Sequence, residues 1–368
     1  QTPPTFSDEV TITATGVETA VEEAPTAVSV VTRDELDDVQ AASVADVLRR
    51  VPGLSVVASG DGGKVASVFT RGTNSNQTLV MMDGVRLNSP YFGGFDWALP
   101  ATAALERIEV ARGPFSALWG PDAVGGVVNL ITQRRSDGFG GRLLAEGGSD
   151  GWERWEATAG FAAGGFDIQA SGFRRSSDGN LPNGDVTGDQ ALLTGGFSWG
   201  RDSRIGLVYQ DLSSEIGIPY VTPGSPTPNR RQDVEQELAA IPLRWSLTKS
   251  WHVEATASRV ERTIEFSDPD DPWGYVFSTT EADTEQLRVA SHHSVGRHTL
   301  SWGGDWRSDS VTTADPFGTS LDDVEEDAAG LFAQDLWQIH RSFRLLVGVR
   351  WEDTCLLYTS PSPRDQRP

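Results

Sequence analysis

The chain has 368 residues, of which 38% are hydrophobic and 22% are charged, and this excludes a disordered composition. Its formal net charge of −22 argues against nucleic acid as a partner, because a surface of that sign repels phosphate groups. The single cysteine, Cys355, excludes an intrachain disulfide framework and a cysteine-rich metal site. No apolar run reaches about 18 residues, which excludes a transmembrane helix but not the alternating strands of a membrane β-barrel.

The start of the chain combines strand and helix patterns. The stretch 8–16, DEVTITATG, favours a strand, and it is acidic at its start and stopped by a glycine. Ser43 predicts the N-cap of an amphipathic helix, which Pro52 and Gly53 end.

The following elements extend the same unit. In 77–88, Asp83 and Gly84 predict a tight turn between two β-rich arms. The stretch 104–113 predicts a helix that runs into a strand, and 123–132 predicts a strand entered through paired glycines. Together these patterns predict a compact α+β domain over the first 135 residues.

After about residue 138 the pattern changes to strict alternation. The stretches 204–210 and 343–352 place apolar side chains on one face and mostly polar ones on the other. Tryptophans recur at the predicted strand ends, and short turns alternate with long polar loops. These tryptophans are Trp152, Trp155, Trp245, Trp251, Trp302, Trp306, Trp337 and Trp351. The strands of a soluble β-sandwich also alternate apolar and polar residues. The tryptophans at the predicted strand ends and the alternation of short turns with long loops favour an antiparallel transmembrane β-barrel.

Three linked motifs carry a resemblance to a known family. They are SVADVLRRVPGLSV, VFTRGTNSNQTLVMMDGVRLN and ERIEVARGPFSALWGPDAVGGVVNLIT. In this order they resemble the plug domain of TonB-dependent outer-membrane transporters, closest to the cobalamin receptor BtuB family. The resemblance is close over 8–134. Over the barrel portion it is limited to the general pattern of alternating strands, short turns and long loops. It implies an α+β plug inside an antiparallel barrel of roughly 22 strands.

The resemblance also gives the first strand a role. It implies that Asp8, Glu9, Val10, Thr11, Ile12, Thr13 and Ala14 form the TonB box. An extended peptide can add as a strand to the edge of a partner's sheet, with affinity from main-chain hydrogen bonds. The alternative is an ordinary frayed terminal strand.

Two plug loops contact the ligand in cobalamin receptors, and here they correspond to 58–67 and 88–97. The second loop is favoured, because its aromatic side chains offer apolar contact and its polar ones can orient a chelate. Packing of the same side chains against the barrel wall is the alternative. The candidate ligand-binding residues are Ser59, Asp61, Lys64, Asn88, Ser89, Tyr91, Phe92, Phe95, Asp96 and Trp97.

Other signals point to metal or catalysis more weakly. Asp178, Asn180, Asp185 and Asp189 offer oxygen ligands for a calcium ion, although a hydrated loop without EF-hand spacing is the favoured alternative. The histidines show no metal-binding spacing and are expected on the surface. The G-x-S-x-G match at 196–200 runs into a strand, so we predict a hairpin and no hydrolase elbow. We predict no enzyme activity and no required cofactor.

The expected domains are 1–16, an extension with the TonB box; 17–135, the plug; 136–354, the N-terminal half of the barrel; and 355–368, a non-native tail. The region 139–353 supplies about eleven strands, half of the family's barrel. A short natural loop is the alternative for the tail.

The resemblance implies active import of a scarce metal chelate across the outer membrane of a Gram-negative bacterium. Cobalamin is the first choice of cargo, and a ferric siderophore or haem is the alternative. The expected partners are TonB with its inner-membrane energising complex, the chelate and outer-membrane lipid, and the receptor is expected to be a monomer. A soluble secreted β-protein is the alternative from another class.

Overall fold

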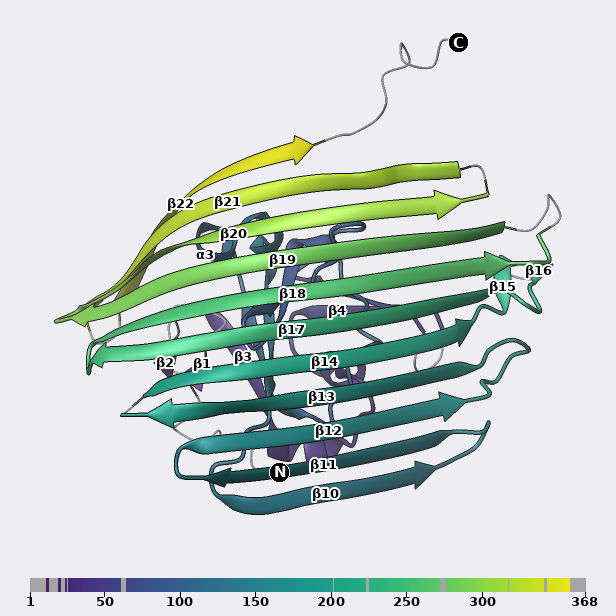
Figure 1. Cartoon of the computed structure of the whole chain (residues 1–368), viewed down its shortest axis with the longest axis horizontal. Coiled ribbons are helices and arrows are strands. Elements are labelled where there is room, and N and C mark those ends of the chain that lie inside the picture. The colour runs from purple at the N-terminus through teal and green to yellow at the C-terminus, as the bar shows by residue number, and fades with distance from the viewer. Residues whose placement is uncertain are drawn as a thin grey trace, which may run out of the picture.

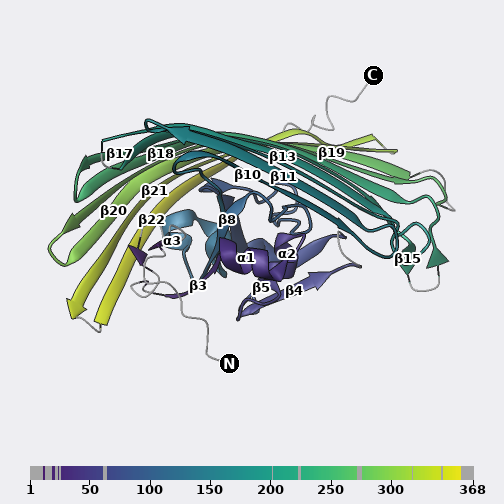
Figure 2. The same ribbon diagram turned by 90° about the horizontal axis from the view of Figure 1, so that it is seen from below.

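The computed structural model describes residues 11–12, 19–20, 24, 26–60, 64–200, 202–222, 225–271, 276–316, 318–340 and 343–357. A broad, curved sheet of long strands dominates the structure (Figure 1). A smaller domain of short strands and helices lies on the concave side of this sheet (Figure 2). We call the smaller domain the plug and the large sheet the barrel wall. Each helix in the described ranges falls short of the length and hydrophobicity that crossing a membrane requires.

The N-terminal elements alternate short strands with short helices. They are β1 (Thr11–Ile12), β2 (Thr19–Ala20), β3 (Ala27–Thr32), α1 (Arg33–Val39), α2 (Val44–Leu48), β4 (Leu54–Ala58), β5 (Ala66–Thr70), η2 (Ser75–Gln77), β6 (Thr78–Met82), β7 (Val85–Arg86), β8 (Leu105–Arg112), α3 (Ser116–Trp119), η3 (Pro121–Ala123) and β9 (Gly126–Thr132). Five of them form one mixed sheet in the order β3-β8-β9-β6-β7, in which only β6 and β9 run parallel. The predicted α+β character is confirmed.

Local sequence signals explain two of these elements. Ser43 caps α2, because its hydroxyl oxygen accepts a hydrogen bond from the Asp46 amide. Asp83 and Gly84 have φ values of 48° and 84°, which is the left-handed geometry of the predicted tight turn. The turn joins β6 to β7 antiparallel.

One predicted element is wrong. The stretch 104–113 contains no helix, and β8 already begins at Leu105. Just before it, Ala101 forms an isolated bridge with Ser43, and the Ala101 amide donates to Gln190 Oε1 at 3.1 Å. A turn leads from Ala101 into β8, and the pairing of β8 with β3 and β9 holds the backbone extended from Leu105 onward.

The barrel wall is one antiparallel sheet of eleven strands in the order β10-β11-β12-β13-β14-β17-β18-β19-β20-β21-β22. This agrees with the predicted number of strands. The bounds are β10 (Gly138–Gly147), β11 (Glu153–Ala163), β12 (Phe166–Ser177), β13 (Val186–Trp199), β14 (Ser203–Gly217), β15 (Tyr220–Thr222), β16 (Ser225–Pro226), β17 (Arg231–Thr248), β18 (Trp251–Asp268), β19 (Val276–Val295), β20 (His298–Asp315), β21 (Gly318–His340) and β22 (Phe343–Leu357). β15 and β16 form a separate hairpin. β22 continues three residues past the domain boundary expected at 354.

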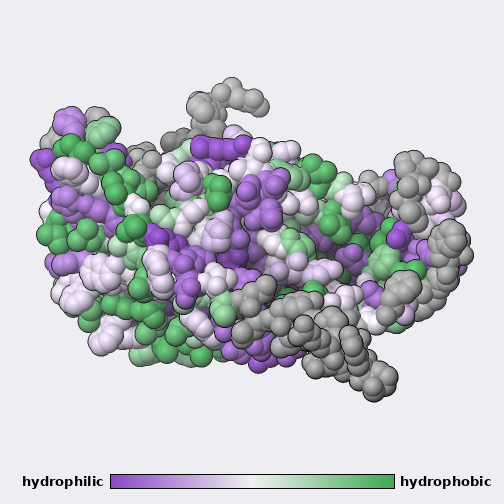
Figure 3. Space-filling view, turned by 90° about the horizontal axis from the view of Figure 1, so that it is seen from above, coloured by the Kyte–Doolittle hydropathy of each residue, from purple (hydrophilic) through white to green (hydrophobic). Residues whose placement is uncertain are grey.

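The outer face of the wall changes from apolar to acidic along each central strand. On β19, Leu287 and Val289 are exposed toward the short turns, whereas Glu281 and Glu285 are exposed toward the long loops. The space-filling view shows hydrophobic residues gathered toward the short-turn end, at the left (Figure 3). From Leu287 to Val295 this part of the outer face measures about 27 Å along the strand and carries no charged carboxylate or guanidinium side chain, with Ser291 and His293 between its valines.

Most of the predicted tryptophans are exposed near strand ends, whereas Trp306 and Trp351 lie in the middle of β20 and β22 and Trp152 is half-buried. Those exposed on the outer face are Trp155, Trp199, Trp245, Trp251, Trp302, Trp306, Trp337 and Trp351. An aromatic ring with a polar nitrogen favours the boundary between hydrocarbon and water, so such rings mark the edges of a membrane span.

Candidate functional site

The loop Asn88–Trp97 contains most of the predicted ligand residues, and its first residue is buried. Asn88 Oδ1 accepts a hydrogen bond from the Val80 amide at 2.8 Å. Its side-chain nitrogen donates to the carbonyls of Thr78 at 3.1 Å and Gly93 at 3.0 Å. Asn88 therefore joins strand β6 to the loop and has its hydrogen-bonding groups engaged inside the plug.

We expect Asn88→Ala to accelerate hydrogen exchange at the Val80 amide by about 5- to 150-fold, because a buried donor without its acceptor costs about 1–3 kcal/mol. Mass spectrometry on peptides that cover 78–88 measures this rate. Asn76→Ala is the matched control, since Asn76 is exposed on the same segment. An unchanged exchange rate in Asn88→Ala would show that the side chain does not hold the loop.

Asp96 also fixes the loop from inside. Its Oδ1 accepts hydrogen bonds from the amides of Ala66 at 2.9 Å and Ala98 at 3.0 Å. Burial raises the pKa of the Asp96 carboxyl, while these two amides and the nearby Arg175 and Arg262 lower it. The carboxylate thus attaches the loop to β5.

Phe95 and Trp97 anchor the loop against the wall. Their rings meet edge to face with centroids 5.3 Å apart, and the residues are only 5% and 1% exposed. The Arg262 guanidinium of β18 lies 5.9 Å from the Phe95 centroid and donates to the Leu87 carbonyl at 3.1 Å. These two aromatic residues therefore hold the plug and are not free to contact a ligand.

Tyr91 and Phe92 are the candidates that stay accessible. They are 47% and 45% exposed, whereas Ser89, whose hydroxyl oxygen accepts from the Tyr91 amide at 3.2 Å, is buried. The loop lies toward the long-loop end of the wall, because Arg175 at the end of β12 donates to the Ala98 carbonyl at 2.7 Å. Two adjacent aromatic side chains are therefore exposed on the long-loop side of the plug.

The other predicted loop, 58–67, is tied to the wall through Lys64. Lys64 is 8% exposed, and its ammonium group donates to the carbonyls of Asp185, at 3.0 Å, and Gly217. The Ser59 hydroxyl donates to the Val65 carbonyl at 3.1 Å and closes the loop. Asp61 lies outside the described residues. Lys64 is therefore a tether between plug and wall, a role that its charge alone did not reveal.

A second connection between plug and wall lies under α3. The Arg288 guanidinium of β19 lies 4.0 Å from the Trp119 ring centroid and donates to the Leu118 carbonyl at 3.2 Å. Arg288 also pairs with Asp305 at 3.0 Å, and Arg350 reaches the same carboxylate at 2.7 Å. The Trp119 ring and the Asp305 carboxylate therefore hold the Arg288 guanidinium between α3 and the wall.

Much of the remaining contact between plug and wall is polar. Wall side chains donate to plug carbonyls in the pairs Arg154 to Gln40, Gln286 to Arg86, Arg262 to Leu87 and Arg175 to Ala98. Apolar wall residues such as Leu238 also join the plug core. Three of the four donors are arginines, and a hydrogen bond that involves a charged group contributes about 1.5–3 kcal/mol net, against about 0.5–1.5 kcal/mol for a neutral one such as that of Gln286. Water can replace each of these contacts when it breaks.

The predicted calcium ligands have other partners in the structure. Asp185 pairs with Arg231 at 2.6 Å, and this arginine lowers the pKa of the Asp185 carboxyl. Asp189 lies 3.3 Å from Arg174. Asp178 and Asn180 precede them in the loop between β12 and β13. The calcium site stays a prediction, and an ion there has to compete with two arginines.

Of the predicted TonB box, Asp8 to Ala14, the structure describes Thr11 and Ile12. These two residues form β1, which pairs antiparallel with β2 through Thr11 with Ala20 and Ile12 with Thr19. The other five residues lie outside the described part of the chain. The TonB box therefore stays a prediction.

The expectation that the histidines lie on the surface is wrong for His292. It is 3% exposed and points to the inside of the wall, where its ring stacks on that of His252 with centroids 4.9 Å apart. The spacing of the histidines in the sequence gives no sign of this contact. The relevant partner lies on the adjacent strand, and the β18–β19 register that pairs it was not known.

An open antiparallel sheet of eleven strands, with an apolar outer segment and an α+β domain on its concave side (Figure 2), has the architecture of part of a plugged outer-membrane barrel. The sequence matches the family models for the TonB-dependent receptor plug domain, over residues 20–127, and the TonB-dependent receptor-like β-barrel, over residues 132–360. The chain belongs to the TonB-dependent receptors, and it is an outer-membrane protein of a Gram-negative bacterium. This is a family of transporters and receptors rather than enzymes.

Curated relatives include the vitamin B12 transporters BtuB of Vibrio vulnificus and Photobacterium profundum. The first is 40% identical over 172 residues, which is 46% of this chain and 28% of the relative. The second is 42% identical over 146 residues, 40% of this chain and 24% of the relative. The aligned part thus spans about a quarter of each relative.

Solved structures share the fold. The pyoverdine outer-membrane receptor FpvA of Pseudomonas aeruginosa PAO1 superposes with a TM-score of 0.80 over 95% of this chain and 60% of its own, at 17% identity. At this identity the similarity concerns the fold alone.

Proposed function

We propose that this chain serves TonB-dependent import of a scarce metal chelate and that the chelate is cobalamin. The observation that carries the proposal is the 40% identity to a vitamin B12 transporter over 172 residues. The exposed Tyr91 and Phe92 support it, because a broad, flat cargo gains contact area from adjacent aromatic rings.

In the proposed mechanism the cargo binds on the long-loop side of the plug against Tyr91 and Phe92. TonB then adds to the extended TonB box as a strand, and force on this segment displaces the plug along its polar contacts with the wall. No covalent bond of the cargo is made or broken. The energy comes from the inner-membrane proton gradient through TonB.

A ferric siderophore is the second candidate cargo. The adjacent, exposed Tyr91 and Phe92 support this candidate too, because aromatic rings suit the flat, apolar parts of many chelating groups as well as they suit a corrin ring. The fold is equally compatible with both cargoes.

Equilibrium binding separates the two candidates. The experiment measures binding of labelled cyanocobalamin, and of a panel of labelled ferric siderophores and haemin, to a receptor of full family length that carries this chain. Saturable binding of cyanocobalamin, not displaced by the ferric chelates, supports the proposal. Saturable binding of a ferric chelate with no binding of cyanocobalamin overturns it in favour of the second candidate.

We expect the double substitution Tyr91→Ala and Phe92→Ala to weaken cargo affinity by about 30- to 900-fold, since two rings that each contribute about 1–2 kcal/mol of buried contact contribute about 2–4 kcal/mol together. Equilibrium binding with the labelled cargo measures the change. Phe277→Ala is the control, because Phe277 is 38% exposed on the outer face of the wall. Equal affinities in both variants would place the ligand elsewhere.

A further inference from the structure

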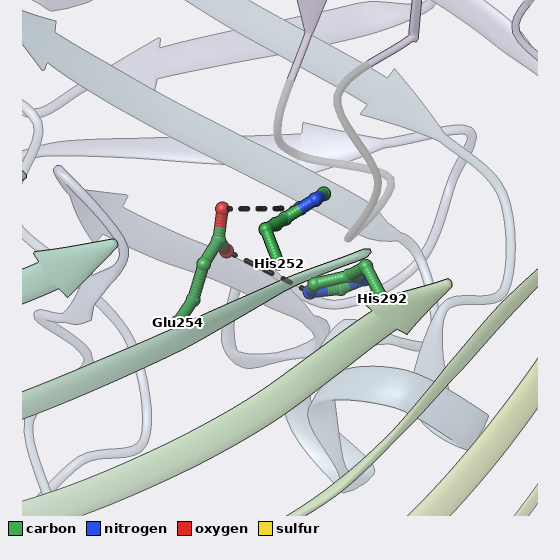
Figure 4. Close-up of side chains that lie close together, drawn as sticks. All are labelled: His252, Glu254 and His292. Carbon is green, nitrogen blue, oxygen red and sulfur yellow. Dashed lines mark ion pairs between the residues drawn. The ribbon is translucent and has the colours of Figure 1, made fainter. Parts of the chain in front are cut away.

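Two histidines and a glutamate meet on the inner face of the wall, near its short turns. His252 and Glu254 lie on β18, and His292 lies opposite His252 on β19 (Figure 4). The Nε2 atoms of His252 and His292 lie 3.8 and 3.7 Å from the two carboxylate oxygens of Glu254. One ligand atom from each residue can be chosen so that all three lie within 4.8 Å of one another.

These separations fit a shared ion better than direct hydrogen bonds. A hydrogen bond between nitrogen and oxygen places the two atoms about 2.7–3.2 Å apart. Tetrahedral ligands at about 2.0–2.1 Å from a zinc ion lie about 3.3–3.4 Å from one another. The observed 3.7 and 3.8 Å are only a few tenths of an ångström wider.

The surroundings orient one of the three groups and place a cation beside another. The Ser301 hydroxyl lies 2.9 Å from His292 Nδ1, which leaves Nε2 directed toward Glu254. Metal-binding histidines are commonly oriented by such a hydrogen bond at their second nitrogen. Arg244 lies 3.5 Å from Glu254 Oε1, the oxygen that also faces His252, and its charge competes with a bound ion for that carboxylate.

The site is accessible from inside. Glu254 and His292 line a cavity of about 480 Å³ between the plug and the wall, which Arg204 and Arg244 also border. An ion can therefore reach the site from the interior without crossing the apolar outer face.

We propose that His252, Glu254 and His292 bind a divalent transition-metal ion on the inner face of the barrel wall. Imidazole nitrogen with carboxylate oxygen is a donor set for zinc, copper, nickel or cobalt, and not for calcium or magnesium, which take oxygen ligands. Three protein ligands leave a fourth position open to water or to a donor atom on another molecule. The proposal goes beyond the import function and is independent of the identity of its cargo.

Binding requires one movement. A bound ion lies in the plane of each imidazole, whereas the two rings are stacked with their planes 23° apart. His252 is the ring that turns, because its side chain is 20% exposed and that of His292 only 4%. Ion binding is therefore accompanied by loss of the stack.

Cobalt serves as a spectroscopic probe of the site. We expect a receptor of full family length carrying this chain, purified without a histidine tag, to bind one Co²⁺ with visible absorption bands that Zn²⁺ removes. His252→Gln and His292→Gln should each weaken binding by about tenfold or more, since each removes one of three ligands. His252 is the safer substitution for folding, because it is the less buried of the two.

Two further variants sharpen the test. His293→Gln is the matched control, because His293 is adjacent in sequence and faces the outside next to Trp251. Arg244→Gln removes a competing cation near Glu254 and should tighten binding by about fivefold. Absence of Co²⁺ binding in the unsubstituted receptor overturns the proposal, and so does equal affinity in the His252→Gln and His293→Gln variants.

Discussion

A disulfide between Ala117→Cys and Gly348→Cys should stop energised uptake and leave cargo binding unchanged. A Cβ atom on Gly348 of β22 would lie 3.1 Å from the Ala117 Cβ of α3, and disulfides join Cβ atoms about 3.5–4.5 Å apart. A shift of a few tenths of an ångström is enough to form the bond. The bond then fixes the plug to the wall beside Trp119, at the far end of the plug from Tyr91 and Phe92.

The measurement compares uptake of labelled cargo before and after reduction. Uptake should fall about tenfold or more in the oxidised receptor and recover with dithiothreitol, because a covalent link resists a force that breaks hydrogen bonds of about 0.5–3 kcal/mol each. The two single-cysteine variants in a Cys355→Ser background are the controls, since Cys355 is an exposed thiol. Full uptake by the oxidised double variant would mean that α3 stays in place during transport.

The strands of the barrel wall were predictable because apolar and polar residues alternate along the sequence with the same two-residue period as the side chains of a strand. Side chains alternate between the faces of a strand, so Ile205 and Leu207 of β14, on the lipid side, could be separated from Val208 and Gln210 without knowledge of neighbouring strands. The strand count followed from the turns between such segments. The tight turn at Asp83 and Gly84 was predictable for a related reason, since its geometry depends on two adjacent residues.

Elements that depend on distant contacts were not predictable in this way. The stretch 104–113 was predicted to begin as a helix, but pairing of β8 with β3 and β9 determines its conformation from Leu105 onward. The same limit applies to the candidate site. Asn88 and Asp96 have the chemistry of ligand residues, and only the fold shows that they are engaged within the plug.

The cluster of His252, Glu254 and His292 shows the limit most clearly. A metal site on a helix leaves a spacing in the sequence, such as two histidines four residues apart. A site across two strands leaves only an alternate-residue pair, His252 and Glu254, which is common in any strand. The third residue is fixed by register, here His252 opposite His292, and register depends on turns and loops along the whole strand pair.

We expect Ile12→Pro to reduce energised uptake about tenfold or more while cargo binding stays unchanged. Proline has no amide hydrogen, so this residue cannot donate a main-chain hydrogen bond to a partner strand. In the structure Ile12 pairs with Thr19 of its own chain in a ladder of two residues per strand. So short a ladder is marginal, and a longer strand on TonB can replace it.

Thr19→Pro is the control that separates pairing of β1 with β2 from the proposed pairing of the TonB box with TonB. It disturbs the same β1–β2 ladder but leaves the predicted TonB box, Asp8 to Ala14, unchanged. Uptake of labelled cargo should therefore be retained in Thr19→Pro and lost in Ile12→Pro. Loss in both variants would trace the effect to the β1–β2 ladder itself, and retention in both would show that the energy-coupling strand lies elsewhere in the chain.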